Sequence, residues 1–178
     1  MQLDLENKSA LITGSTRGIG FAIALQLAKE GAKVIINGRR EQAVSSAIDT
    51  IRREVPEAQV EGFAGDLSSA EGVRTLHHRY KEIDILVNNL GIYEPKSFEE
   101  ITDEEWKRYF ETNVLSGVRL SRAYLGGMKK RGWGRILFIS SESGVQIPVE
   151  MIHYGMTKTA QLSLSRGLAE HCRGTGVT

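Results

Sequence analysis

The sequence has little of the residues that build disulfide-linked scaffolds or membrane-spanning helices. Among its 178 residues there are three prolines and a single cysteine, Cys172. One cysteine forms no internal disulfide, which favours a reducing, cytoplasmic location. The longest stretch without a charged side chain, 18–28, has 11 residues, whereas a helix that crosses a membrane needs about 20 apolar residues. Residues 1–4 contain neither a basic nor an apolar region, so we expect no signal peptide.

An excess of charge of one sign is also missing, because 23 Lys and Arg oppose 22 Asp and Glu and leave a formal net charge of +1. A charge so near zero gives no electrostatic reason to expect nucleic acid or an anionic membrane as a partner. The hydrophobic share of 40% and the charged share of 25% are ordinary for a globular protein. Glycine is in excess, with 19 residues, about 11% against an average of about 7%.

Short apolar runs alternate with longer amphipathic segments along the whole chain. Ser68–Glu71 and Thr102–Glu105 are capping-box patterns that mark helix starts. We predict strands at 9–12, 33–37, 60–64, 83–88 and 135–140, and helices at 18–30, 41–54, 68–80, 102–128 and 152–171. This alternation predicts an α/β fold, a doubly wound parallel sheet with helices on both faces. Residues 1–7 are expected to be loose, and Val177 and Thr178 to start a further strand.

A glycine-rich segment, Thr13 to Gly20, follows the first predicted strand and opens the first predicted helix. Glycines let the backbone approach a pyrophosphate closely, and a helix N-terminus offers free N–H groups to an anion. The spacing is G-x-x-x-G-x-G rather than the usual G-x-G-x-x-G fingerprint. The segment therefore predicts a phosphate-binding loop, with a purely structural strand-to-helix turn as the alternative.

The residues after the second strand bear on which nucleotide would bind. An acidic residue there would hold a ribose 2′-hydroxyl, but the chain reads Arg39-Arg40 before Glu41. Arginine suits a 2′-phosphate, because its planar guanidinium pairs with phosphate oxygens, and Arg17 in the loop would add a second cation. We therefore expect NADP(H) rather than NAD(H). Two alternatives remain: solvated turn arginines, or Glu41 holding NAD(H).

Tyr154 and Lys158 are spaced i, i+4 in the last predicted helix, so they share a helix face. A free phenol is a poor acid–base catalyst at neutral pH, but a neighbouring ammonium favours its phenolate form. Ser140, Ser141 and Ser143 follow the fifth strand and could hold a substrate oxygen. The pattern alone is common as a surface pair; its place at the carboxyl edge of the sheet favours a catalytic role.

These motifs occur together in one order: Thr13–Gly20, Asn88-Asn89-Leu90-Gly91, Asn113, Ser141, Tyr154 and Lys158. In this combination the chain resembles the short-chain dehydrogenase/reductase family, and within it the 3-oxoacyl-(acyl-carrier-protein) reductases. The resemblance implies a single Rossmann-like, NAD(P)-binding domain over residues 1–178 and an NADP(H)-dependent oxidoreductase acting on CH–OH groups. It also implies a small carbonyl or alcohol substrate, no metal, and assembly as a homodimer or homotetramer.

The resemblance implies four catalytic residues. Tyr154 would be the general acid in reduction and the base in oxidation, and Lys158 would hold the nicotinamide ribose and favour the phenolate. Ser141, 13 residues before Tyr154, would bind the substrate oxygen, with Ser140 and Ser143 as rivals. Asn113 would anchor a water that relays protons to Lys158.

The resemblance also implies a set of cofactor-binding residues. Asp66 would accept a hydrogen bond from the adenine amino group, with Leu67 beside the ring, and Asn89 and Gly91 would form the floor under the adenosine ribose. The remaining expected contacts are Gly14, Ser15, Thr16, Arg17, Gly18, Ile19, Gly20, Arg39, Tyr154 and Lys158.

Two departures from the family pattern qualify this interpretation. Leu90 stands where the family has alanine, which puts a larger side chain near the expected cofactor. The family also continues past Thr178 with a sixth and a seventh strand, so the fold is expected to be truncated, with its C-terminal part missing. A non-catalytic NADP(H)-binding module or an inactive fragment is therefore the alternative function.

Overall fold

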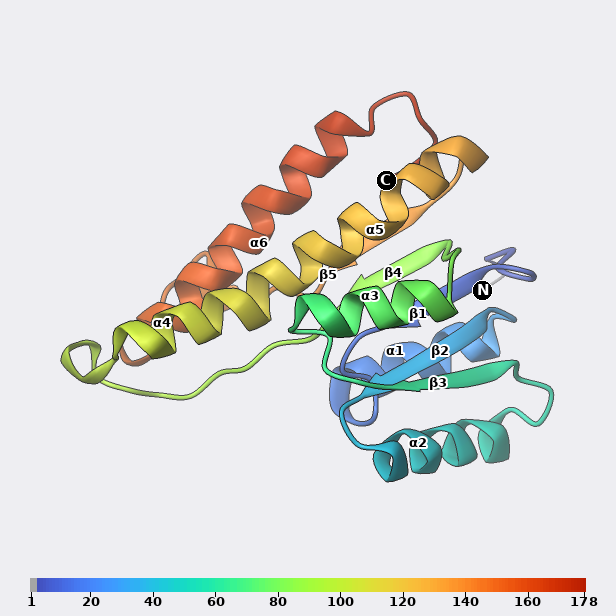
Figure 1. The fold of residues 1–178 in the computed structure, drawn as a ribbon, viewed down its shortest axis with the longest axis horizontal. Helices are drawn as coiled ribbons and strands as arrows, with labels where there is room; N and C mark the ends of the chain where they lie inside the picture. The colour runs from blue at the N-terminus through green and yellow to red at the C-terminus, as the bar shows by residue number, and fades with distance from the viewer. Residues whose placement is uncertain (1–2) are drawn as a thin grey trace.

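The computed structural model describes residues 3–178; Met1 and Gln2, the start of the segment expected to be loose, lie outside the described residues. The elements follow the predicted alternation (Figure 1). They are β1 (Ser9–Ile12), α1 (Gly18–Lys29), β2 (Lys33–Gly38), α2 (Glu41–Glu54), β3 (Val60–Ala64), α3 (Ala70–Arg79), β4 (Ile85–Asn88), η1 (Phe98–Glu100), α4 (Asp103–Phe110), η2 (Glu111–Leu115), α5 (Ser116–Arg131), β5 (Arg135–Phe138), η3 (Glu142–Gly144), η4 (Val149–Met151) and α6 (Ile152–His171).

The five strands form one sheet in the order β3-β2-β1-β4-β5, and every neighbouring pair is parallel. Figure 1 shows α1 and α2 on one side of the sheet and α3, α5 and α6 on the other. The chain thus winds outward from β1 in both directions, which confirms the predicted doubly wound α/β fold. The order reverses between β1 and β4, and open α/β sheets bind ligands beyond the carboxyl ends of such strands.

Both faces of the central strands are buried, which explains why these segments are continuous apolar runs rather than alternating ones. Ala10 and Ile12 pack with α1 and α2 in one core cluster. Leu11, between them in sequence, points to the opposite face and packs with α3 and α5 in a second cluster. The sheet is therefore packed between two hydrophobic cores, which fix the position of its carboxyl edge.

The long helix expected at 102–128 is interrupted. Thr102 and Glu105 form the predicted capping box at its start, but residues Glu111–Leu115 make a π-helical turn before the α-helix resumes. The helix then runs to Arg131 and ends at Gly132, whose φ of 68° is left-handed. π-Turns inside α-helices occur frequently at functional sites, and this one carries Asn113.

Other boundaries differ from the expectations for local reasons. The cap of α3 is Ser69, whose side chain accepts from the Gly72 N–H, because Ser68 instead donates to Asp66. The strands expected at 83–88 and 135–140 are shorter, at Ile85–Asn88 and Arg135–Phe138. The amino-terminal segment is not loose throughout, since Leu5 is buried in the first core cluster.

The end of the chain lies beside β5. Val177 makes a parallel bridge with Gly134, and the Ile136 amide donates to the Thr178 carbonyl over 2.9 Å. This pairing agrees with the expected start of a further strand. None of the helices within residues 3–178 is long and apolar enough to cross a membrane.

Candidate active site

The residues singled out from the sequence lie after the carboxyl ends of the five strands, in the π-turn Glu111–Leu115 and in the first turns of α1 and α6. Because these strands are parallel neighbours, their carboxyl ends share one edge of the sheet. This edge is where a ligand would be expected in a doubly wound fold.

The glycine-rich loop is fastened to β2 by buried hydrogen bonds. Ser15, 0% exposed, donates its hydroxyl to the Ile12 carbonyl (2.6 Å) and accepts from the Asn37 amide (2.9 Å). The Asn37 side chain in turn accepts from the Gly14 amide and donates to the Phe63 and Gly65 carbonyls. The Ser15 hydroxyl therefore shapes the loop, and the expectation of Ser15 as a cofactor contact stays a prediction.

A second attachment joins the loop to the end of β4. The Asn89 side chain donates to the carbonyls of Thr13 (2.9 Å) and Gly14 (3.1 Å), while the Thr13 hydroxyl accepts from the amides of Asn89 and Leu90. Gly20 lies against this junction, so closely that a Cβ there would be 2.5 Å from Asn89 Nδ2 and 2.7 Å from the Gly14 oxygen. Gly20 is thus required for the first turn of α1 to reach the loop.

The outer part of the loop is open and can hold an anion. Gly14 and Gly18 have φ values of 60° and 61°, which favour glycine. Helix α1 starts at Gly18 with no side-chain cap from Arg17, so the N–H groups of its first turn have no capping side chain. Arg17 and Ile19 are exposed beside them, and Thr16 is half-buried.

The residues expected to select the nucleotide flank this loop. Arg39 is exposed just after β2 and makes no ion pair or side-chain hydrogen bond within residues 3–178. Glu41 is the first residue of α2. Exposed Asp66 accepts from the amide and hydroxyl of Ser68. The Leu67 side chain is 1% exposed and packs in the second core cluster, and the expected place of Leu67 beside the adenine ring stays a prediction.

Lys158 places a positive charge inside the protein. Its side chain is 4% exposed, and its ammonium donates to the Ile139 carbonyl (2.7 Å) and to Gln161 Oε1 (3.2 Å). Burial lowers the pKa of Lys158 to about 8, because removal from water disfavours the charged form. The Lys158 ammonium can therefore release its proton much nearer to neutral pH than an exposed lysine can.

Tyr154 lies one helical turn before Lys158, as the spacing predicts. The Lys158 ammonium is 5.5 Å from the centroid of the Tyr154 ring, which is half-buried. Exposed Tyr93, from the loop after β4, packs against it with ring centroids 6.0 Å apart. The phenol and the ammonium thus share one side of α6, beside the loop that follows β4.

Among the three candidate serines, Ser141 and Ser143 lie on the turn before α6 and Ser140 points elsewhere. Ser140 donates to the Lys158 carbonyl, so its hydroxyl serves packing. Ser141 is half-buried and caps η3, accepting from the Ser143 amide at 3.2 Å. That contact leaves the Ser141 O–H free to donate to a substrate oxygen.

Asn113 lies in the π-turn with its side chain 1% exposed. Its amide accepts from the Ile92 N–H (2.8 Å) and donates to the Ile92 carbonyl (3.0 Å) and to Thr157 Oγ1 (3.0 Å). The backbone carbonyl of Asn113 accepts from Gln161 Nε2 at 2.6 Å. Asn113 therefore joins the loop after β4 to α6, and its expected role in anchoring a water stays a prediction.

Asn37 and Gln161 are functional candidates that the sequence reasoning missed. Both are polar residues that are 2% exposed. A buried amide needs partners, and each of these uses both ends of its amide on loop or lysine groups. The sequence offered one signal for Asn37, namely that a polar residue follows the apolar run of β2. It offered no signal for Gln161.

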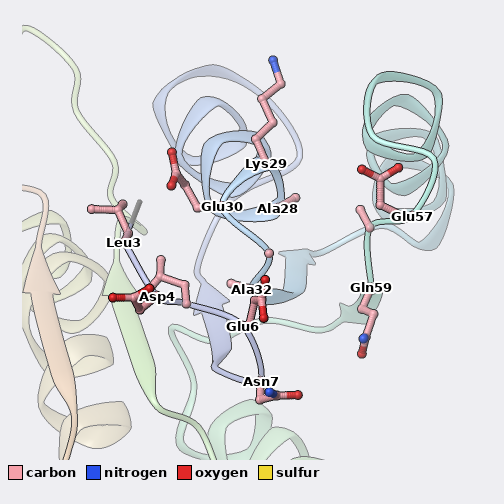
Figure 2. A pocket seen from close by; sticks show the side chains of 13 residues that line it. Leu3, Asp4, Glu6, Asn7, Ala28, Lys29, Glu30, Ala32, Glu57 and Gln59 are labelled. Carbon is pink, nitrogen blue, oxygen red and sulfur yellow. The ribbon is translucent and has the colours of Figure 1, made fainter. Parts of the chain in front are cut away.

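A separate cavity of about 680 Å³ lies at the opposite edge of the sheet, lined by residues 3–7, 28–32 and 57–59. Figure 2 shows Asp4, Glu6 and Asn7 on the chain before β1, close to the end of α1. This edge holds the amino ends of the parallel strands, away from the candidate catalytic residues.

Comparison with known proteins agrees with this architecture. Residues 8–178 match the family model described as short chain dehydrogenase. The chain belongs to the short-chain dehydrogenase family. This is an oxidoreductase family, as the resemblance implied, and its members include dehydrogenases and reductases.

Two relatives show the range of the family. The chain is 53% identical over 178 residues to Uncharacterized oxidoreductase YvaG of Bacillus subtilis (strain 168), covering 100% of this chain and 67% of the relative. It is 35% identical over 177 residues to 3-oxoacyl-(acyl-carrier-protein) reductase FabG of Escherichia coli (strain K12), covering 99% of this chain and 72% of that protein. The chain thus spans roughly two thirds of the length of these relatives.

Solved structures of family members superpose closely. L-sorbose reductase from Gluconobacter frateurii, complexed with NADPH and L-sorbose, is 33% identical with a TM-score of 0.92, over 99% of this chain and 68% of that chain. A gluconate 5-dehydrogenase from Burkholderia cenocepacia J2315, in complex with NADP and tartrate, is 29% identical with a TM-score of 0.88, over 98% and 69%.

The packing of Gly20 predicts the cost of filling its space. We expect Gly20→Ala to lower the free energy of unfolding by about 1–3 kcal/mol, because the added methyl overlaps Asn89 and the Gly14 carbonyl. Gly126→Ala is the matched control, since a Cβ at Gly126 meets nothing within 4 Å. Urea unfolding measures both; equal effects of the two substitutions would contradict the packing.

The burial of Lys158 predicts how stability depends on pH. An unfolded lysine titrates near 10.4, so between about pH 8 and that value the unfolded chain binds more protons and the free energy of unfolding rises with pH. We expect Lys158→Met to lack this rise, which amounts to about 3 kcal/mol. The control is Lys81→Met, at an exposed lysine. Parallel stability curves for wild type and Lys158→Met would contradict a lowered lysine pKa.

Proposed function

We propose that residues 1–178 form the nucleotide-binding and catalytic domain of an NADP(H)-dependent oxidoreductase that interconverts a ketone and a secondary alcohol. One observation carries the proposal: a buried ammonium 5.5 Å from the ring of a half-buried tyrosine, at the ligand-binding edge of a doubly wound sheet. Burying a charged group costs free energy, and groups whose pKa is shifted by burial cluster at functional sites.

The residues present fit a dinucleotide. The uncapped start of α1 suits a pyrophosphate, and exposed Arg17 and Arg39 suit a 2′-phosphate. Gly91 borders the proposed catalytic residues, because a Cβ there would lie at ordinary contact distance, 3.7 Å from Lys158 Nζ and 3.6 Å from Asn113 Oδ1. The NADP(H) bound in L-sorbose reductase and in the gluconate 5-dehydrogenase supports the same choice; Glu41 holding NAD(H) remains the alternative.

In the proposed mechanism, a bound nicotinamide supplies or accepts the hydride, and the chain moves the proton. Tyr154 Oη donates its proton to the carbonyl oxygen in reduction and accepts the alcohol proton in oxidation. The Ser141 hydroxyl donates a hydrogen bond that holds the same oxygen. Lys158, two of whose three N–H donors are used by Ile139 and Gln161, keeps one for a ribose hydroxyl.

Lys158 also stabilises the phenolate that forms when Tyr154 gives up its proton. Burial favours this interaction, because the effective dielectric constant inside the protein is lower than in water. Since the pKa of Lys158 is about 8, the ammonium is charged in most molecules at pH 7 and weakens as an electrostatic partner above pH 8. The remaining proposed contacts, Asp66 for the adenine and Asn89 for the adenosine ribose, lie on the same edge of the sheet.

Replacement of Tyr154 tests the proton transfer. We expect Tyr154→Phe to bind NADPH with unchanged affinity and to lose about 10²–10⁴-fold in kcat, the usual contribution of a general acid. NADPH fluorescence titration and the consumption of NADPH with a panel of ketones measure the two quantities. Tyr93→Phe is the control for loss of a nearby phenol. Wild-type binding of NADPH without turnover of any ketone would favour the non-catalytic module or inactive fragment instead.

Replacement of Arg39 tests the choice of nucleotide. We expect Arg39→Ala to weaken NADPH roughly tenfold and NADH hardly at all, because only NADPH carries the 2′-phosphate that a charged donor would contact. Arg166→Ala, at an exposed arginine on α6, is the control for loss of one positive charge. Calorimetric titration with both nucleotides measures the difference; equal weakening of the two would defeat the 2′-phosphate assignment.

A further inference from the structure

Gln161 lies one turn after Lys158 on α6 and is 2% exposed. Its amide makes two hydrogen bonds with the candidate site. Gln161 Oε1 accepts from the Lys158 ammonium at 3.2 Å, and Gln161 Nε2 donates to the backbone carbonyl of Asn113 at 2.6 Å. One side chain thus connects the buried charge to the π-turn on the neighbouring helix.

The chemistry of the two partners requires an amide at this position. An ammonium can only donate and a carbonyl can only accept, so the group between them must accept at one end and donate at the other. Leucine or methionine would leave the Asn113 carbonyl without this donor and Lys158 with one acceptor fewer. A glutamate would bring a carboxylate up to both groups, attracting the ammonium and repelling the carbonyl.

Within the described residues, no carboxylate forms an ion pair with Lys158. The elements packed against α6 are α4, η2, β5, η3 and η4, and their charged residues are Asp103, Glu104, Glu105, Lys107, Arg108, Glu111, Arg135, Glu142 and Glu150. Within residues 3–178, none of these lies in an ion pair with Lys158; Glu105 pairs with Lys96 and Glu111 with Arg119. The titratable group that does face the ammonium is Tyr154. Neutral acceptors, Ile139 and Gln161, therefore hold the charge.

We propose that Gln161 is a positioning residue, whose amide holds the Lys158 ammonium toward Tyr154 and fixes it relative to the π-turn through the Asn113 carbonyl. The inference rests on the proposed function for its catalytic meaning, since it concerns the same lysine. Because an amide does not ionise at neutral pH, this link orients the lysine without exchanging a proton with it.

The test measures Lys158 directly in the chain without nucleotide. The ¹³Cε resonance of labelled lysine reports its titration, and the signal lost in Lys158→Ala assigns it. We expect Gln161→Met, similar in length and shape but without the amide, to lower the Lys158 pKa below the parent value, because the charged form loses an acceptor. We expect Gln161→Glu to raise it. Gln42→Leu, at an exposed glutamine of α2, is the control and should leave it unchanged.

A purely structural role for Gln161 would change the melting temperature without moving the lysine titration. An unchanged Lys158 pKa in folded Gln161→Met and Gln161→Glu would therefore overturn the proposal. If the methionine variant does not fold, the glutamate variant alone decides, since its opposite shift is required. Both substitutions leave the exposed outer loop residues in place.

The pH dependence of kcat/KM with NADPH and a ketone separates this inference from the proposed function. We expect the alkaline limb to move in the same direction as the Lys158 pKa in each variant, while KM for NADPH changes less than kcat. A shifted lysine titration in a wild-type chain that turns over no ketone would reject the proposed function and keep the positioning role. Active wild type with an unshifted titration in both variants would reject the positioning role alone.

Discussion

The positive charge on Lys158 must be given hydrogen-bond acceptors inside the protein, and several segments at the carboxyl edge of the sheet provide them. The carbonyl of Ile139 comes from the end of β5, and the amide of Gln161 comes from the next turn of α6. Gln161 is held by Asn113 in the π-turn, and Asn113 is held by Ile92 and Thr157. Three separate segments are thus fixed relative to one ammonium, and Tyr154 takes its place beside it.

The nucleotide end of the site depends on a second set of buried amides. Asn37 and Asn89 attach the glycine-rich loop to β2 and β4, and Gly20 lets α1 approach that junction. These attachments use the inward-facing groups of the loop, Ser15 among them, and leave the outward N–H groups and Arg17 for a ligand. The two ends of the site are joined through the segment after β4, which carries Asn89, Gly91 and Ile92.

The order, type and approximate bounds of the elements could be predicted from the sequence, because apolar runs, capping residues and glycines are local signals. Helix α2, for example, has the predicted bounds. The π-turn could not be predicted, since Asn113 and Thr157 meet only through tertiary contact. For the same reason, the surroundings of Ser15, Leu67 and Gln161 could not be predicted. Whether a side chain faces the core or the surface depends on its burial and its hydrogen-bond partners, and many of those partners are distant in sequence.

A crystal structure of this chain with NADP⁺ tests the central claim most directly, because it shows where the nicotinamide lies relative to the buried charge. The account predicts the pyrophosphate at the start of α1, a ribose hydroxyl bonded to the Lys158 ammonium, and the nicotinamide beside the Tyr154 hydroxyl. A dinucleotide bound elsewhere, or one whose nicotinamide lies away from Tyr154 and Lys158, would contradict it.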